Sequence, residues 1–239
     1  MNRMSMLWVN RVVAPALVVG LTTGLAAAGV AQSVGGQAYG TYVNTPTGFS
    51  TRSPLAVLPA ISGTDGAEAD AQGSTLNIAG ALSSEFLSST TSGELGTLEA
   101  GAQSTASAAS VNILNGLITA DEVVANVMSS RTASTAVSNA DGSTFTNLVV
   151  AGVPVTSGDA AVAPNTNISL PGVGYVVLNE QLPAGDGVTS SGLTVNMIHV
   201  YLQSLVGGVL DPLTGKVVGG SLQTTGEIIV GSATSNASM

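Results

Sequence analysis

The chain has 239 residues, of which 44% are hydrophobic, 8% charged and 3% aromatic, with 30 glycines and no cysteine. Its formal net charge of −9 makes nucleic acid an unfavourable partner, because an acidic protein repels phosphate backbones. The lack of cysteine excludes disulfide bonds and zinc sites built on thiolates, while the many small and β-branched residues favour strands over helices.

Residues 1–31 have the layout of a secretory signal peptide, with a short helix expected in the signal. Two basic residues, Arg3 and Arg11, precede an uncharged apolar run that ends in small residues. An anchoring transmembrane helix is the alternative, because about 20 apolar residues suffice to span a bilayer. Pro15 and the terminal alanines favour cleavage over a permanent anchor.

Cleavage is expected between Ala31 and Gln32, with Ala28 as the alternative site, and it leaves no stable membrane span. Residues 32–239 then form a single all-β domain, a length that one large domain accommodates. Cleavage removes two of the five basic residues and none of the 14 acidic ones, so the net charge changes from −9 to −11. We expect a secreted, extracellular protein that is stabilised without disulfide bonds.

The first part of the mature chain predicts strands at 39–44 and 54–59, separated by a turn-rich segment. Residues 61–73 are rich in glycine, alanine and acidic side chains, and we interpret them as a loop. Alternating small and apolar residues from 75 to about 115 predict further strands whose neighbours approach closely.

The acidic loop offers one candidate calcium site. Glu68, Asp70, Gln72 and Gly73 imitate the start of an EF-hand loop, but Ala79 stands where the bidentate acid is needed. A solvated acidic loop without metal is therefore the favoured interpretation, and we expect no cofactor.

Residues 116–137 are ambiguous in secondary structure. Thr119 and Glu122 match a helix capping box, whereas the density of β-branched residues predicts a long strand, which we favour. A turn is expected at 139–142, followed by a strand or strand pair bent near Gly152.

Three strands at 173–181, 193–202 and 226–234 complete the set, with a hairpin at 206–220 whose turn lies around Asp211 and Pro212. Short strands with frequent turn signals and no fixed repeat predict an all-β fold, an antiparallel β-sandwich. An irregular β-solenoid is the alternative.

The segment LTVNMIHVYL contains the only histidine, His199. Strict alternation would place it with Met197 and Tyr201, and both faces of the strand are mainly apolar, which favours a structural histidine over a catalyst. If residues 173–181 pair with this strand with Gln181 opposite Leu193, Glu180 lies far from His199. A slip of one residue would bring the two side chains to one face.

Residues 163–233 resemble the C-terminal half of the bacterial choice-of-anchor P family. The resemblance rests on a Pro-Asn-Thr motif, a Leu-Pro-Gly-x-Gly strand, Leu-Asn-Glu-Gln, a Val-Asn-x-x-His strand and a terminal Val-x-Gly-Ser strand. The matching positions in this chain include Asn165, Gly172, Gly174, Asn179, Glu180, Asn196, His199, Val230, Gly231 and Ser232. The resemblance implies an exported bacterial protein tied to the cell surface, and it brings no catalytic residues with it. This chain ends without a sorting motif, so free secretion or non-covalent surface association is expected.

We expect a non-enzymatic structural or interaction protein that contacts a cell-envelope or matrix polymer, or that self-associates. A carbohydrate- or calcium-binding module is the alternative. The mature chain has four tyrosines, three phenylalanines and no tryptophan, and this scarcity of aromatic platforms weighs against sugar binding.

Overall fold

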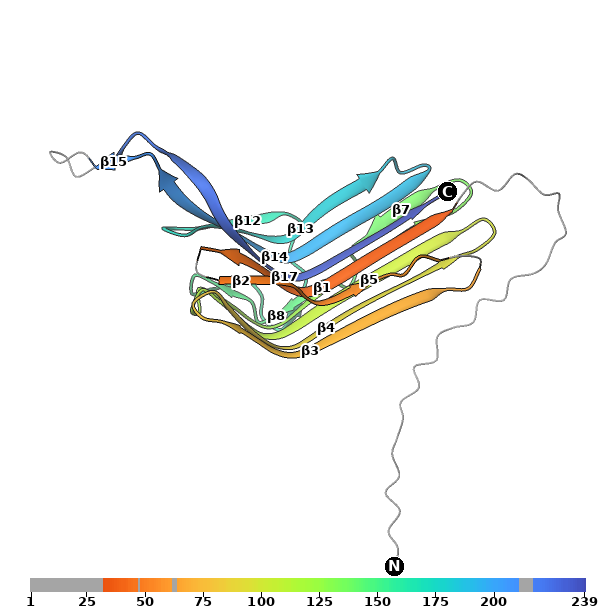
Figure 1. Ribbon diagram of the computed structural model, residues 1–239, viewed down its shortest axis with the longest axis horizontal. Helices are drawn as coiled ribbons and strands as arrows, with labels where there is room; N and C mark the ends of the chain where they lie inside the picture. The colour runs from red at the N-terminus through yellow and green to blue at the C-terminus, as the bar shows by residue number, and fades with distance from the viewer. Residues whose placement is uncertain (1–31, 47, 62–63, 211–216) are drawn as a thin grey trace, which may run out of the picture. The chain divides into compact units, whose positions relative to one another are not determined.

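Figure 1 shows a computed structural model of the chain, which describes residues 32–46, 48–61, 64–210 and 217–239. The expected signal peptide with its helix, and the turn around Asp211 and Pro212, lie outside the described residues. The described part is all-β and consists of two large antiparallel sheets that face each other, with a short two-stranded ribbon. The prediction of an antiparallel β-sandwich is confirmed, and the solenoid alternative is wrong.

One sheet has six strands and carries both ends of the described chain. In spatial order the strands are β12 (Thr166–Leu170), β13 (Gly174–Gly185), β14 (Ser190–Val206), β17 (Ser221–Ser238), β1 (Ser33–Thr45) and β2 (Gly48–Val57). We call it sheet A.

The second sheet, sheet B, has nine strands. Its main path is β10 (Val153–Pro154), β9 (Val149–Val150), β6 (Ile118–Arg131), β5 (Ala100–Ile113), β4 (Leu82–Leu95) and β3 (Ala67–Ile78); the other members are β7 (Ala136–Asn139), β8 (Thr144–Thr146) and β11 (Asp159–Ala160). Within the described ranges, no helix is long and apolar enough to cross a membrane.

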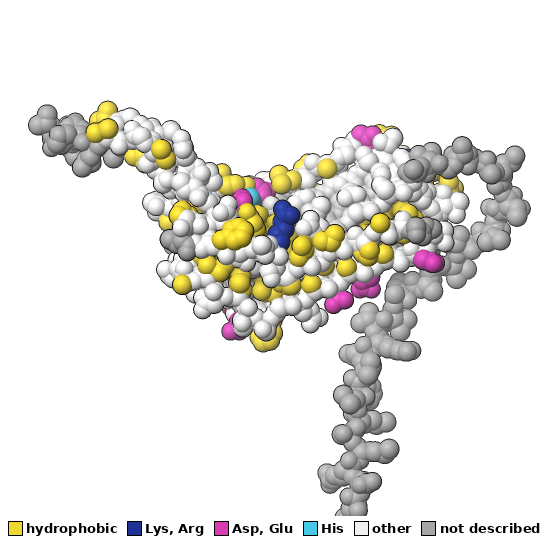
Figure 2. All heavy atoms as spheres, in the orientation of Figure 1, with side chains coloured by type: hydrophobic (Ala, Val, Ile, Leu, Met, Phe, Trp, Pro, Cys, Tyr) yellow, Lys and Arg dark blue, Asp and Glu magenta, His cyan; other side chains and the backbone are white. Residues whose placement is uncertain are grey.

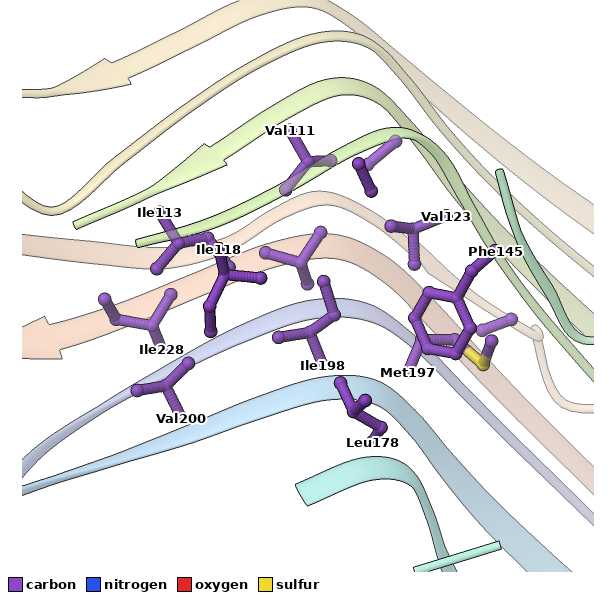
Figure 3. Close-up of a cluster of buried hydrophobic side chains, with 14 of the residues drawn as sticks. Val111, Ile113, Ile118, Val123, Phe145, Leu178, Met197, Ile198, Val200 and Ile228 are labelled. Atoms are coloured by element: carbon purple, nitrogen blue, oxygen red, sulfur yellow. The ribbon is translucent and has the colours of Figure 1, made fainter. Parts of the chain in front are cut away.

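The apolar core lies between the two sheets, at the level shown in Figure 3. Sheet B contributes side chains from β5, β6 and β8, and sheet A contributes side chains from β13, β14 and β17. The labelled members are Val111, Ile113, Ile118, Val123, Phe145, Leu178, Met197, Ile198, Val200 and Ile228, each at most 2% exposed. Their burial provides the main stabilising free energy of the sandwich.

Hydroxyl groups replace large apolar side chains in another part of the same interface. Ser129 on β6 contacts Ser235 on β17, with 2.7 Å between the two hydroxyl oxygens. Ser104 on β5 donates to the carbonyl of Thr234 at 2.7 Å. A Cβ on Gly36 would lie 2.0 Å from the Thr91 hydroxyl oxygen, so the sheets approach too closely here for large residues. The small residues of the composition are thus explained by this close approach.

Four neighbouring strands of sheet A are interrupted at one level. Gly40, Asn179, Met197 and Gly231 lie side by side on β1, β13, β14 and β17, and we call this row the bend line. Asn179 and Gly231 have left-handed backbones, with φ of 49° and 67°. The strands arch near this level in Figure 3. Such an interruption exchanges the faces to which the following side chains point.

Two local expectations are settled by the strand assignments. Residues 118–131 form a strand, as favoured over the helix that Thr119 and Glu122 could have capped. The loop expected at 61–73 is wrong in its second half, because β3 begins at Ala67. Small residues alternate there with exposed polar ones, and this period of two pairs with β4 along its whole length.

The predicted C-terminal hairpin is present as an extension of β14 and β17. Residues 204–206 and 221–223 pair with each other, and the ribbon continues into β15 (Val209–Leu210) and β16 (Val217–Val218). Leu205 and Leu222 form an exposed cross-strand pair on it.

Candidate functional site

Glu180 on β13 is the centre of a buried polar network on the outer face of sheet A. Its Oε2 accepts hydrogen bonds from Asn196 Nδ2 at 2.7 Å and from His199 Nδ1 at 2.7 Å, and Tyr201 donates to Oε1 at 2.8 Å. Burial raises the pKa of this carboxyl, but the hydrogen bonds from His199, Asn196 and Tyr201 outweigh it and lower the pKa to about 2. Glu180 is therefore held as a carboxylate.

His199 links Glu180 to a second carboxylate. Its Nε2 lies 3.1 Å from Glu227 Oε2 on β17, and the His199 side chain is only 8% exposed. Because carboxylates only accept hydrogen bonds, both contacts are hydrogen bonds when both ring nitrogens carry a proton. The Glu227 side chain is 34% exposed, so this second carboxylate connects the network to solvent.

Aromatic rings cover the other side of the histidine. The His199 and Tyr201 rings stack at 3.9 Å between centroids, and Tyr175 stacks on Tyr201 at 4.7 Å. Burial, followed by the hydrogen bond to Glu180, raises the pKa of Tyr201 well above its ordinary value. Tyr201 thus remains a neutral donor to the carboxylate at all ordinary pH values.

The strand pairing explains why sequence reasoning missed this cluster. Odd residues face odd residues, as the register considered above assumes, but the pairing of Gln181 with Leu193 is wrong, because Gln181 lies opposite Val195. Glu180 therefore pairs with Asn196, two residues nearer to His199 than that register placed it. The conclusion that Glu180 then lies far from His199 is wrong, because the bend line exchanges the faces between them. Met197 and Ile198 both point into the core, whereas Asn196 and His199 both point outward. Asn179 and Gly231, residue types that tolerate positive φ, are the signals in the sequence.

The remaining motif positions lie close to this network. Asn165 Oδ1 accepts from the backbone N–H of Gln181 at 2.9 Å, and Gln181 donates to Asn179 Oδ1 at 3.1 Å. Asn179 in turn donates to the carbonyl of Val162 at 2.7 Å, which ties the segment before β12 to β13. Ser232 on β17 donates to Asn196 Oδ1 at 2.7 Å.

Among the residues that the structure describes, the two motif glycines and the cleavage position contribute no hydrogen bond to the network. Gly172 and Gly174 have positive φ at the turn between β12 and β13. Gln32 donates from its side chain to the carbonyl of Thr97 at 3.1 Å, whereas Ala31 is outside the described residues.

A groove of about 390 Å³ lies beside the network on sheet A. It crosses four strands, and its lining is mostly polar: Gln37, Tyr39, Tyr42, Arg52, Thr194, Asn196, Glu227, Ile229, Ser232 and Thr234. The Arg52 guanidinium lies over the Tyr39 ring, 5.2 Å from its centroid. Figure 2 shows the basic side chain on this face close to the histidine and acidic side chains. The groove and the network therefore share Asn196, Glu227 and Ser232.

A larger hollow of about 590 Å³ lies on sheet B, but it offers less chemistry. Glycine, alanine and serine supply most of its lining, and both of its charged residues, Glu68 and Glu94, are acidic. The EF-hand-like arrangement suggested for Glu68, Asp70 and Gln72 is wrong, because these residues belong to the extended strand β3. Across the described ranges, no group of three or more histidine, cysteine or acidic side chains is arranged to hold a metal ion.

Comparison of the chain with protein-family models, with curated proteins and with solved structures gives no match.

Proposed function

We propose that the protein is an exported bacterial protein that acts as a non-enzymatic structural or interaction component at or outside the cell surface. One observation carries the proposal: the groups that acid–base chemistry would need are already bound to one another. Both nitrogens of His199 contact carboxylates, and Glu180 accepts from three side chains. A general base needs a free lone pair directed at its substrate, whereas His199 and Glu180 direct their hydrogen-bonding groups at each other and at their neighbours in the network.

We also propose that this chain belongs to the choice-of-anchor P family. Its support is that motif positions separated in sequence, among them Asn165, Asn179, Glu180 and His199, meet in one hydrogen-bonded region. The residues of a motif that marks a family are expected to form one structural unit in the fold.

Export is supported by the layout of residues 1–31 and by the position of β1, which begins at Ser33, directly after the expected cleavage point. The mass of the protein recovered from outside the cell tests this. A chain that begins at Gln32 is expected, and an intact chain retained in the cytoplasm would contradict export.

The contact function is tested by sedimentation with insoluble cell envelopes of the encoding bacterium. The exported protein is expected to sediment in a saturable manner, while the supernatant gains no soluble sugars or peptides over time. A time-dependent release of such fragments that stops in His199→Gln would contradict the proposal and make the network a catalytic centre.

A further inference from the structure

All four tyrosines of the chain lie on the outer face of sheet A. Tyr39 and Tyr42 line the groove, and Tyr175 and Tyr201 stack beside His199. The low aromatic content of the sequence weighs against sugar binding only if the rings are scattered. Arg52 covers the Tyr39 ring, and Tyr201 is stacked between His199 and Tyr175, whereas Tyr42 and Tyr175 are only half-buried. The exposed ring surface of Tyr42 and Tyr175 is of the kind against which sugar rings pack.

The groove also contains hydrogen-bonding groups that the protein does not use. The Gln37 amide, the Arg52 guanidinium and the Tyr42 hydroxyl make no hydrogen bond with any residue that the structure describes, and Glu227 keeps one oxygen free of His199. These groups include both donors and acceptors. A ligand that matches them must itself carry many groups that both donate and accept, as hydroxyls do.

The charges of the groove cancel. Arg52 on β2 and Glu227 on β17 are its charged residues, and they have opposite signs. The chain as a whole has a net charge of −9, so long-range attraction does not favour an anionic polymer. A cationic polymer would meet Arg52. An uncharged ligand avoids both penalties.

The walls of the groove are held in place by the buried network. His199 fixes Glu227, and Glu180 and Ser232 together fix the side-chain amide of Asn196. A site whose polar groups are fixed before binding loses less conformational entropy when the ligand arrives. The volume of about 390 Å³ lies within the range of roughly 300–1,000 Å³ that is typical of small-ligand sites.

We propose that this groove binds a short stretch of an uncharged, hydroxyl-rich glycan. The inference rests on the proposed function, because it names the chemistry of the polymer that the protein contacts. Glu180 and His199 then act as positioning residues beneath the groove, and Arg52 and Tyr42 contact the sugar.

Isothermal titration calorimetry of the exported protein tests the inference with cellohexaose and maltohexaose as neutral probes and a galacturonic acid hexamer as the anionic probe. At least one neutral hexamer is expected to bind. Arg52→Ala and Tyr42→Ala are each expected to weaken that binding by about 3–10-fold, the effect of one lost hydrogen bond. Phe86→Ala, which alters an exposed side chain on sheet B, is the matched control and leaves the affinity unchanged.

Three results would overturn the inference: binding of the anionic hexamer alone, binding of no hexamer, or neutral binding that survives both groove substitutions. If the protein still sediments with cell envelopes in any of these cases, the proposed function stands and only the glycan site fails. If sedimentation is also absent, the proposed function fails as well.

Discussion

At Glu180, burial and hydrogen bonding act on one carboxylate in opposite directions. The hydrogen bonds prevail, and the pKa falls from its ordinary value of 4.5 to about 2. A carboxyl group whose pKa is lowered by folding stabilises the folded state above pH 4.5. That contribution is lost as the pH falls toward 2, because the unfolded chain takes up the proton first.

The substitution Glu180→Gln is therefore expected to lower the free energy of unfolding at pH 7 by about 2–4 kcal/mol, since it removes a buried hydrogen-bonded charge. Urea unfolding measured from pH 7 down to pH 2 checks this. The stability of the variant is expected to change less between pH 4.5 and 2 than that of the wild type, because glutamine does not titrate.

The matched control is Glu227→Gln, which changes the more exposed carboxylate of the same histidine. A loss below about 1 kcal/mol is expected there, as for other exposed ion pairs. An equal acid dependence in Glu180→Gln and the wild type would show that Glu180 is not the titrating group.

At the scale of the strands, the bend line determines which side chains meet. Gly231 has a φ of 67°, and a Cβ there would lie 3.0 Å from Val123 Cγ1 and 3.5 Å from Met197 Cβ. Gly80 has a similar φ of 75° but no neighbour within 4 Å of its ideal Cβ. Substitutions at these two glycines therefore distinguish the effect of backbone strain from the effect of crowding in the core.

Gly231→Ala is expected to lower the free energy of unfolding by about 2–4 kcal/mol, and Gly80→Ala by about 1 kcal/mol, because only the first substitution adds crowding to strain. The urea midpoints of the two variants measure the difference. Equal losses at both positions would contradict a packed, inward-facing Gly231.

The positions of the strands could largely be predicted from the sequence, whereas the face to which each side chain points could not. The density of β-branched residues correctly predicted a strand in the segment that includes Val123, and turn-forming residue types predicted the hairpin between β14 and β17. Strict alternation failed beyond Met197, because left-handed residues on both neighbouring strands, Asn179 and Gly231, lie at the level where the pattern changes phase. It also went unused at β3, where alanine carries the inward positions and gives a weak hydrophobic signal.

At the scale of the whole molecule, two kinds of contact join the sheets. One is the apolar core around Phe145, and the other is the set of serine contacts around Ser129. Frequent turn signals between short strands predicted a sandwich, and the many small residues predicted strands whose neighbours approach closely. The serine pairs between sheets could not be predicted, because they depend on how one sheet lies over the other.

Ser129→Ala is expected to lower the free energy of unfolding by about 1–2 kcal/mol, because it leaves the buried Ser235 hydroxyl without its partner. Ser129→Val is expected to lower the free energy of unfolding by about a further 1–3 kcal/mol, because the gap between the sheets has no room for two methyl groups. Ser107→Ala, which removes a half-buried contact within sheet B, is the control and is expected to have a smaller effect than either. Thermal unfolding of the three variants measures the order, and a valine variant as stable as the alanine variant would contradict close sheet packing.

The central claim is that His199 is locked between Glu180 and Glu227 as a positioning residue beneath the groove. The most direct test is a ¹⁵N-resolved NMR spectrum of the His199 ring in the exported protein. We predict a downfield Nδ1 proton that exchanges slowly with water, persists in Glu227→Gln and disappears in Glu180→Gln. A ring proton in fast exchange in the wild type, insensitive to Glu180→Gln, would show that the network does not form and would contradict the account.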